Sequence, residues 1–295
     1  MDAADLKVFE AVARSGGMSR AASELNTVQS NVTARIRHLE QDLATSLFYR
    51  SNRGVSLTPA GRRLLPYAQR VARLLDEARR ATHDDGTPRG PLVIGSLETT
   101  AAMRLSTFLS VYVARFPEVD VALKTGTSGE LIDLVLSERI EGAFVCGPVH
   151  HPDLVEERMF REELVVLTAP GVASLTAALA CPGVRIIVMR AGCSYRLSLE
   201  ALLAHRGIVG IRHLEFASLE SILACVGAGL GITMLPKALV ERTLRDKPFA
   251  VHPLAPDERI VETMFVRRRD GFASSALEAF LNLARASGIV AAAAE

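Results

Sequence analysis

Apolar residues in the first part of the chain recur every three or four positions, which is the spacing of helices that bury one face. A first helix is predicted over the stripe formed by Leu6, Phe9 and Val12. Gly16-Gly17 follows that stripe and can supply the positive φ at which many helices end. The chain therefore begins with a short amphipathic helix and a glycine stop.

A second and a third helix follow closely. Ser19 is predicted to cap the second, and Asn26-Thr27 to form a tight turn into the third, TVQSNVTARIRHLE at positions 27–40. The first turn of that third helix offers only uncharged polar side chains: Gln29, Ser30, Asn31 and Thr33. A helix face that meets only water usually carries Lys and Glu pairs. The pattern is typical of a helix-turn-helix, and the alternative is a structural three-helix bundle.

The next segment predicts a wing and a long helix. Leu47-Phe48 is an apolar pair, and Asn52-Arg53-Gly54 is a turn between two segments able to form a β-hairpin. Thr58-Pro59 is an N-cap followed by proline at the first helical position. The helix predicted over 59–83 has an apolar stripe too long for so small a domain to cover, so we expect it to pair with a second copy of itself. Pro66 predicts a bend in it.

Strands and helices alternate beyond residue 90. Gly86, Pro88 and Gly90 make 84–90 a hinge without regular structure. Buried strands are predicted at 91–96, 119–125 and 142–147, with helices over 99–116 and 128–137 between them. This order predicts a parallel sheet with right-handed crossovers and helices on both faces.

A second α/β set follows the first. Its strands are predicted at 163–169, 185–190, 212–217 and 231–236, with helices over 194–206 and from Leu219 onward. A long strand over 259–269 then crosses back to the first set, and a helix over 275–286 ends the pattern. We therefore predict two lobes with a cleft between them, one formed by 91–162 plus about 262–295 and the other by 163–261.

Composition narrows the class of protein. A chain of 295 residues favours two or three domains, and no apolar run approaches the roughly 18 residues of a membrane span. The N-terminus has Asp2 and Asp5 where a signal peptide would be basic and then apolar, so we expect a cytoplasmic protein with no membrane partner. The four cysteines have neither disulfide nor zinc spacing, which leaves open a redox role for a pair of them: Cys146, Cys181, Cys193 and Cys225.

Charge is unevenly distributed along the chain. Residues 1–83 contain 13 Lys and Arg against 8 Asp and Glu, a net of +5, so the rest of a chain with a total of +1 carries −4. Twelve of those 13 cations are arginine. A basic head on a mildly acidic body is typical of a nucleic-acid-binding segment joined to another domain.

The segment AASELNTVQSNVTARIRHLEQDLATSLFYRSNRGVSLTPAG, with the long helix after it, resembles the N-terminal domain of the LysR-type transcriptional regulators. The match is dense from about Leu6 to Leu75, and the rest is similar to the family's effector domain, which is shaped like a type 2 periplasmic binding protein. The resemblance implies a winged helix-turn-helix at 1–58, a dimerisation helix at 59–83 and an effector-binding domain at 91–295. It also implies a homodimer, often paired into a homotetramer, and a small-molecule co-inducer between the lobes.

Two positions depart from the family pattern. The family commonly has Ser at the position of Val28, where it caps the recognition helix, and Pro at the position of Ser30. The cap is therefore expected to fall to Thr27 or Asn26, and base contacts are expected to differ in detail. Thr45 or its neighbour replaces a common glycine.

Candidate contacts to double-stranded promoter DNA follow from the recognition helix and the wing. Gln29 can pair with adenine, hydroxyls suit either type of base, and the Ala34 methyl can touch thymine. Arg53 at the wing tip is expected in the minor groove, and Arg37 and Arg50 on phosphates. The alternative is a solvated helix face. The full set of candidates is Gln29, Ser30, Thr33, Ala34, Arg35, Arg37, Arg50 and Arg53.

Candidate effector contacts lie in three loops that follow parallel strands, where α/β sheets bind ligands. They are Ser96, Leu97, Glu98, Thr99 and Thr100 in the first loop, Thr125, Gly126, Thr127 and Ser128 in the second, and Cys193, Ser194, Tyr195 and Arg196 in the third. Helix N-termini there favour an anion, so we expect a small carboxylate. Glu98 favours an amine-bearing ligand instead, Arg196 is a candidate cation that a surface salt bridge would occupy, and helix capping alone would explain Ser128 or Ser194.

No motif in the chain indicates an enzyme or a bound cofactor. GAGLGI at 227–232 lies between a helix and a strand, the reverse of the dinucleotide-binding order. A nucleophile elbow and an H-E-x-x-H motif are both absent from the sequence, so neither a hydrolase nor a catalytic metal is expected. The alternative to a regulator is a solute-binding or transferase-like α/β protein with a helical appendage, which would need neither the wing nor the long helix.

Overall fold

The computed structural model describes residues 1–295 except 52–53, 181–182, 244–248, 257 and 287–295. The chain forms two compact units, Met1–Asp85 and Gly86–Glu295. Among the helices in the described ranges, none is long and apolar enough to cross a membrane.

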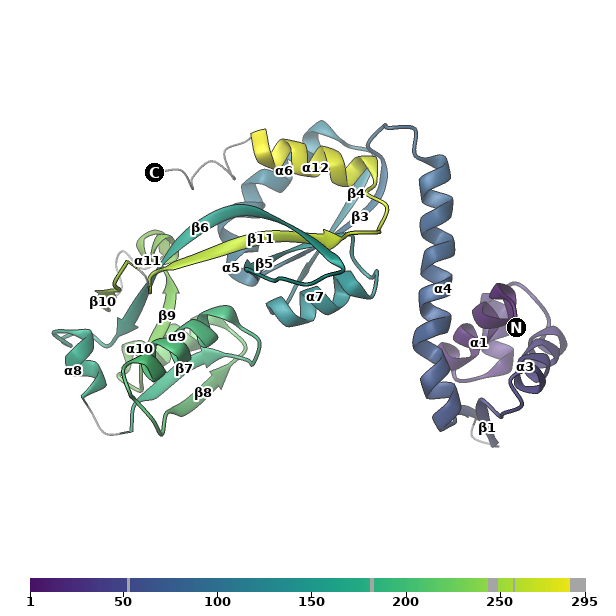
Figure 1. Ribbon diagram of the computed structural model, residues 1–295, viewed down its shortest axis with the longest axis horizontal. Coiled ribbons are helices and arrows are strands. Elements are labelled where there is room, and N and C mark those ends of the chain that lie inside the picture. The colour runs from purple at the N-terminus through teal and green to yellow at the C-terminus, as the bar shows by residue number, and fades with distance from the viewer. Residues whose placement is uncertain (52–53, 181–182, 244–248, 257, 287–295) are drawn as a thin grey trace. The chain divides into compact units, whose positions relative to one another are not determined.

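The first unit is a winged helix-turn-helix followed by a long helix (Figure 1). Its elements are α1 (Ala3–Ser15), α2 (Met18–Glu24), α3 (Gln29–Asp42), β1 (Phe48–Ser51), β2 (Gly54–Leu57) and α4 (Pro59–His83). β1 and β2 form an antiparallel hairpin. Its core is apolar, with Phe9, Val32 and Ile36 fully buried and the rings of Phe9 and Phe48 5.2 Å apart. The predicted order of elements in this unit is confirmed.

Local signals explain most boundaries in the first unit. Asp2 and Asp5 form a capping box at the start of α1, and Gly16 ends that helix at φ 66°. The Thr58 hydroxyl accepts a hydrogen bond from the Gly61 amide at 3.0 Å, as predicted for the start of α4. The predicted Ser19 cap is wrong: Gly17 is the N-cap of α2, and Ser19 lies inside the helix.

The first lobe of the second unit has a parallel three-stranded core. β3 (Gly90–Ser96) pairs with β4 (Val119–Thr125) on one side and β5 (Gly142–Gly147) on the other. The helix predicted over 99–116 is a continuous helical stretch with a π-helical turn in it: α5 (Glu98–Thr100), η1 (Ala101–Leu105) and α6 (Ser106–Arg115). α7 (Ser128–Leu136) and α12 (Ser275–Ala286) complete the lobe. Its core is aromatic, with Phe144, Phe265 and Phe280 in edge-to-face or tilted contacts.

The second lobe is built from a second strand–helix set. β7 (Arg185–Met189) and β8 (Arg212–Phe216) are parallel, and Ile232 forms an isolated bridge with Ile186. The remaining elements are α8 (Leu175–Leu179), α9 (Ser194–His205), α10 (Leu219–Gly227), β9 (Thr233–Pro236), α11 (Lys237–Thr243) and β10 (Ala250–Pro253). α8, α11 and β10 did not appear in the sequence prediction.

Two long antiparallel strands connect the lobes (Figure 1). β11 (Ile260–Arg268) pairs with β5 of the first lobe and with β6 (Leu154–Thr168). The far end of β6 pairs with β9 and β10 of the second lobe. The prediction of a strand over 163–169 was therefore too short. The predicted parallel pairing of β3, β4 and β5 is confirmed, but β6, β9, β10 and β11 add antiparallel pairs that the sequence did not indicate. The predicted return strand is confirmed as β11.

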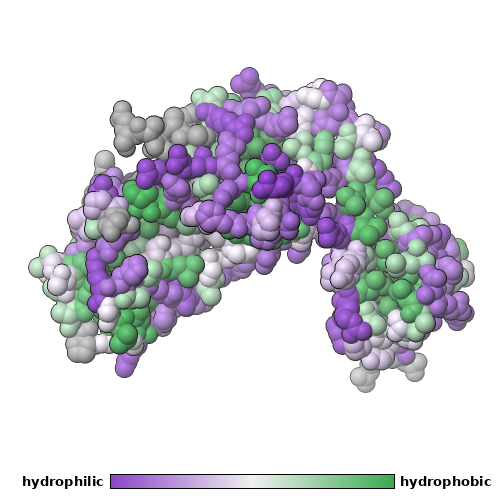
Figure 2. Space-filling model, in the orientation of Figure 1, coloured by the Kyte–Doolittle hydropathy of each residue, from purple (hydrophilic) through white to green (hydrophobic). Residues whose placement is uncertain are grey.

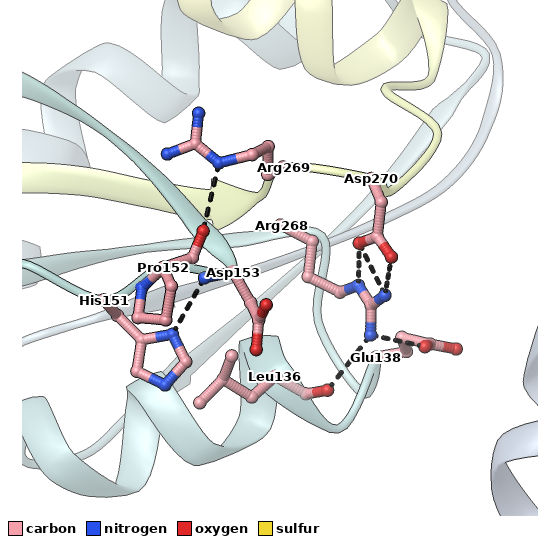
Figure 3. A network of polar contacts seen from close by, with 8 residues as sticks. All are labelled: Leu136, Glu138, His151, Pro152, Asp153, Arg268, Arg269 and Asp270. Carbon is pink, nitrogen blue, oxygen red and sulfur yellow. Dashed lines mark hydrogen bonds and ion pairs between the residues drawn. The ribbon is translucent and has the colours of Figure 1, made fainter.

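Two arginines at the end of β11 fix that end of the strand to its neighbours (Figure 3). Arg268 holds the Asp270 carboxylate at 2.5–2.6 Å and lies 2.6 Å from a Glu138 oxygen. Arg269 donates from Nε to the Pro152 carbonyl at 3.1 Å. The Arg268–Glu138 contact joins the β11 terminus to the residues after α7, and the Arg269 contact joins it to the segment that leads into β6. The crossing strands therefore have a firm anchor in the first lobe.

Candidate functional site

The recognition helix α3 presents the predicted polar side chains to solvent. Gln29, Ser30, Ala34 and Arg37 are exposed, while Val32, Ile36 and Leu39 on the other face are fully buried. The Ser19 hydroxyl of α2 donates to Gln29 Oε1 at 2.9 Å, and the Thr33 hydroxyl donates to the Gln29 carbonyl at 2.9 Å. Gln29 is therefore oriented by its neighbours, while its amide nitrogen stays available.

The start of α3 has no side-chain cap. Val28 is the N-cap, and its side chain is exposed. The expected capping by Thr27 or Asn26 is wrong: the Thr27 hydroxyl accepts instead from the Asn31 side chain at 3.0 Å. Asn26 adopts φ 50° and makes the tight turn. The first amides of α3 thus have no capping acceptor from these side chains, which leaves donors at this end of the helix.

The candidate arginines differ in their surroundings. Arg35 forms an ion pair at 2.9 Å with Asp5, whose side chain is only 3% exposed, so Arg35 joins α3 to α1. Arg50 contacts Glu40 at 2.8 Å on the wing. Arg37 is exposed and has no ion-pair partner among the described residues. Arg53 lies outside the described residues.

Hydrophobic surface runs along the long helix α4 (Figure 2). Leu74 is 57% and Leu75 41% exposed, and Tyr67 is exposed as well. Leu64, Leu65 and Val71 nearer the start of the helix pack against the core of the first unit. The part of α4 beyond that core therefore carries large apolar side chains that its own unit does not cover.

The three predicted loops of the second unit meet at one cavity of about 70 Å³, enough for several water molecules or a small organic molecule. It is lined by Leu97, Glu98, Thr99, Thr125, Gly126, Thr127, Met189, Arg190, Cys193, Ser194 and Tyr195. The first two loops follow β3 and β4 in the first lobe, and the third follows β7 in the second lobe. The cavity therefore lies between the lobes, and the predicted convergence of the loops is found.

Four predicted residues do not line the cavity. Ser96 is fully buried and donates to the Leu97 carbonyl, and the Thr100 hydroxyl is buried with no hydrogen-bond partner in the described part of the chain. Ser128 Oγ accepts from the Cys146 amide at 3.1 Å and lies 3.0 Å from Ser194 Oγ. Arg196 is held by Glu200 and Glu215, each at 2.8 Å, which is the surface salt bridge considered from the sequence.

Capping does not explain the serines at the helix starts. Thr127 caps α7 in a capping box with Glu130, and Cys193 is the N-cap of α9 without a side-chain bond. Ser128 and Ser194 instead contact each other across the two lobes. Thr127, Cys193 and Ser194 at these helix starts line the cavity, and the Ser128 and Ser194 hydroxyls are used in contacts other than capping.

Sequence reasoning missed two lining residues, Met189 and Arg190, which end the β7 segment. Arg190 is exposed, and its guanidinium lies 3.1 Å from a carboxylate oxygen of Glu130. The hydrogen bond from the Thr127 amide, together with Arg190, holds the pKa of Glu130 below its usual value. Arg190 could have been identified because it directly follows the parallel strand β7, but the predicted strand over 185–190 included it. Arg190, unlike Arg196, lines the cavity, and like Arg196 it is ion-paired with a carboxylate.

A buried polar chain lies behind the cavity. Thr99 Oγ1 is 3.0 Å from the Tyr195 hydroxyl, which donates to Glu162 Oε2 at 3.2 Å. Burial raises the pKa of Glu162, while Tyr195 and Arg104 act in the opposite direction. Burial also raises the pKa of Tyr195 well above its usual value, and that of the Cys146 thiol. Glu162 is a site residue that sequence reasoning did not identify.

Two family models cover the chain. The model for bacterial regulatory helix-turn-helix proteins of the lysR family matches residues 3–62, and that for the LysR substrate binding domain matches residues 85–288. The HTH-type transcriptional regulator GltR of Bacillus subtilis is 42% identical over 276 residues, which are 94% of this chain and 93% of GltR. YofA of Bacillus velezensis is 42% identical over 282 residues, 96% of this chain and 97% of YofA.

Solved structures share the fold. Full-length CbnR, crystallised with its target DNA, has a TM-score of 0.66 at 24% identity, covering 97% of this chain and 100% of CbnR. A full-length OxyR variant from Pseudomonas aeruginosa has a TM-score of 0.68 at 19% identity, covering 100% of this chain and 98% of OxyR. Because both family models match and relatives exceed 40% identity along nearly the whole chain, this protein belongs to the LysR family of transcriptional regulators.

Proposed function

We propose that this LysR-type regulator acts in the cytoplasm, binds promoter DNA through α3 and the wing, and is controlled by a small carboxylate bound in the cavity between its lobes. We assign the parts as a DNA-binding domain at 1–58, a dimerisation helix at 59–83, a hinge at 84–90 and an effector-binding domain at 91–295.

The observation that carries the effector assignment is the convergence of cationic and partly positive groups on one cavity. Arg190 lines it, and α7 and α9 begin at it with Thr127 and Cys193 as N-caps. A helix N-terminus stabilises a nearby anion by about 0.3–1 kcal/mol. Two such termini and a guanidinium favour a carboxylate, and the small cavity favours a molecule of few heavy atoms.

One specific observation supports a second class of ligand. Glu98 lines the cavity and is exposed, so its carboxylate is available to an ammonium group. A ligand with both a carboxylate and an amine would use Glu98 and Arg190 together. We place this class second because Glu98 is one group, whereas three features favour the carboxylate.

The exposed apolar side chains of α4 support a homodimer through this helix, and two dimers would form a homotetramer. Exposed Gln29, Ser30 and Ala34, with half-buried Thr33, are proposed to contact bases, and Arg37 and Arg50 phosphates. Arg53 keeps its proposed place in the minor groove on sequence grounds alone. Arg35 is the weakest of the proposed contacts, because it is paired with Asp5.

The effector proposal is tested with matched small acids, amides and amines against the full-length protein by calorimetry and thermal shift. Acids should bind most tightly, and Arg190→Gln should weaken their binding by about tenfold, the loss of one charge-assisted contact. Arg196→Gln is the control, because it removes the same charge from a residue outside the cavity lining. Equal binding of amides and acids, or equal effects of the two variants, would show that the assignment is wrong.

A further inference from the structure

Three buried side chains link both lobes to the crossing strand. Thr99 comes from α5, Tyr195 from α9 and Glu162 from β6, and their exposed fractions are 8%, 7% and 6%. Thr99 and Tyr195 line the cavity, whereas Glu162 is outside its lining and accepts a hydrogen bond from the Tyr195 hydroxyl. A change at Glu162 can therefore reach a bound ligand along one short path.

Counting hydrogens fixes the direction of this chain. A hydroxyl has one hydrogen to donate, and an ionised carboxylate only accepts. When Glu162 is ionised, Tyr195 must donate to it and can contact Thr99 only by accepting, so the Thr99 hydrogen is used by Tyr195. Thr99 then offers a cavity ligand lone pairs alone.

Protonation of Glu162 reverses the direction. The carboxylic acid donates to the Tyr195 oxygen, Tyr195 donates to Thr99, and the Thr99 hydrogen becomes free to point into the cavity. The site then offers a donor, which a carboxylate ligand accepts. One proton, added from solvent to a residue that does not touch the ligand, thus changes the chemical group that the cavity prefers.

The surroundings of Glu162 act on its protonation in opposing directions. Tyr195 of α9, Arg104 of η1 and Cys146 of β5 are the titratable and charged groups that act on it. Burial raises its pKa and opposes the stabilising effects of Tyr195 and Arg104. Arg104 also makes a cation–π contact, in which its guanidinium lies 5.4 Å from the centre of the Phe160 ring.

We propose that Glu162 is a positioning residue of the effector site: through Tyr195 it sets whether Thr99 donates to or accepts from the ligand, and a carboxylate that binds beside Thr99 is taken up together with one proton on Glu162. This inference rests on the proposed carboxylate site, and it predicts tighter binding of acids as the pH falls.

The first test needs no ligand. The protein has four tyrosines, and full-length protein labelled with ¹³C at the tyrosine ζ carbon reports the hydrogen bonding of each hydroxyl. Tyr195→Phe assigns the Tyr195 signal. That signal should move in a single one-proton step below the pH at which Tyr195 itself ionises, and Glu162→Gln should abolish the step. A Tyr195 signal that does not titrate, or that titrates equally in Glu162→Gln, overturns the proposal.

Glu163→Gln is the matched control. It makes the same change one position along β6, at a half-buried carboxylate that lies near Lys237 and Arg259 rather than near Tyr195. The Tyr195 step should persist in this variant. Loss of the Tyr195 step in Glu163→Gln would mean that the step depends on the charge of the strand as a whole. That result would also overturn the proposal.

The second test measures binding of acetate, succinate and glutarate, with their neutral amides, to the full-length protein at several pH values. The Kd of an acid should rise with pH by up to about tenfold per unit, the limit for uptake of one proton, and should be independent of pH in Glu162→Gln. Acids that bind with a pH-independent Kd overturn the proposal and leave the carboxylate site intact. If no acid binds although Tyr195 titrates, the proposed effector class is wrong and the role of Glu162 is supported.

Discussion

The helix α3 exposes its polar side chains to solvent, whereas the cavity between the lobes encloses most of its hydroxyl groups. On α3, Gln29, Ser30 and Arg37 stand exposed on a fully apolar base, whereas the cavity hydroxyls of Thr99, Thr127 and Tyr195 are buried. DNA brings a dense charge and a large surface, so flexible exposed side chains can contact it. A small ligand has few atoms, so its site must be enclosed and its hydroxyls held in place beforehand.

This difference has a consequence for substitutions. Exposed side chains of α3 make few contacts within their own unit, so their loss should change DNA binding while stability stays nearly constant. Hydroxyls that line the cavity are bonded across the lobes, Thr99 to Tyr195 and Ser194 to Ser128 beside the cavity, so their loss should change both binding and stability. Four expected results test or sharpen this contrast.

The largest effect is expected on α4, because apolar side chains that are exposed in one protomer should be buried in the proposed dimer. Leu74→Asp with Leu75→Asp would place uncompensated charge in the proposed helix–helix interface and dissociate the dimer. Losing the linkage of two DNA-binding domains should lower operator affinity by at least about 100-fold. Sedimentation analysis and DNA titration measure the two results.

Thr82→Asp is the control for that variant, because it adds a charge at an exposed polar position of the same helix. It should leave the protein dimeric. A double variant that stays dimeric with its DNA affinity intact would show that α4 is not the interface.

The next effect contrasts two arginines of α3. Arg35→Ala leaves the buried Asp5 carboxylate without its partly exposed cation and should destabilise the first unit by about 1–3 kcal/mol. Arg37→Ala, two residues away and exposed, should change stability by less than about 0.5 kcal/mol while reducing the salt dependence of DNA binding. Hydrogen exchange of the α1 and α3 peptides in the full-length protein separates the two. Equal protection in both variants would contradict the structural role of Arg35.

Elements with local signals were predictable from the sequence. Thr58-Pro59, Gly16 and the alternating strands fixed most boundaries, and the three loops after β3, β4 and β7 were identified because parallel strands end at one edge. N-caps without a side-chain acceptor were not predictable: Val28 is the N-cap of α3 and Cys193 that of α9, although the start of α9 at Ser194 was predicted. Nothing in their chemistry marks a helix start.

Long-range features were predicted least well. The first half of β6 carries Glu156, Glu157, Arg158 and Arg161, so it lacks the apolar signal of a buried strand and is held by pairing with β11, about a hundred residues later. Glu162 was not predicted as a site residue, because its neighbours Arg161 and Glu163 are charged and nothing local indicates that its own side chain is buried against Tyr195. Glu162 was therefore missed because its burial depends on segments distant in the sequence, whereas Arg190 was missed because the predicted strand included it.

A smaller and more local effect is expected for Gln29. Gln29→Ala should lower affinity by about 1–3 kcal/mol at one base pair in each half-site and leave non-specific binding nearly unchanged, because a Gln amide can pair with one adenine. Binding to a set of operators with single base changes measures this. Ser23→Ala, on the exposed surface of α2, is the control. A uniform loss on all sequences would mean that Gln29 positions the helix and does not recognise a base.

The smallest effect compares two carboxylates on β6. Glu157 is half exposed, and Arg285 contacts both its oxygens, at 2.7 and 2.6 Å; this hydrogen bonding lowers the pKa of Glu157 from its usual 4.5, whereas burial raises that of Glu162. The stabilisation from Glu157 is therefore complete above pH 4.5 and is lost as the pH falls through its lowered pKa. The effect of Glu162 on stability has the opposite sign. Because its pKa is raised in the folded protein, its deprotonation lowers the free energy of unfolding as the pH rises.

Replacing each carboxylate by glutamine should therefore give opposite pH trends. Glu157→Gln should lower stability by about 0.5–1 kcal/mol at neutral pH, the value of an exposed ion pair, and converge on the wild type in acid. Glu162→Gln should gain stability relative to the wild type as the pH rises. Chemical denaturation of both variants across the same pH series measures the trends. Parallel trends would mean that the burial of Glu162, on which the contrast between exposed and enclosed polar groups depends, has no effect on its ionisation.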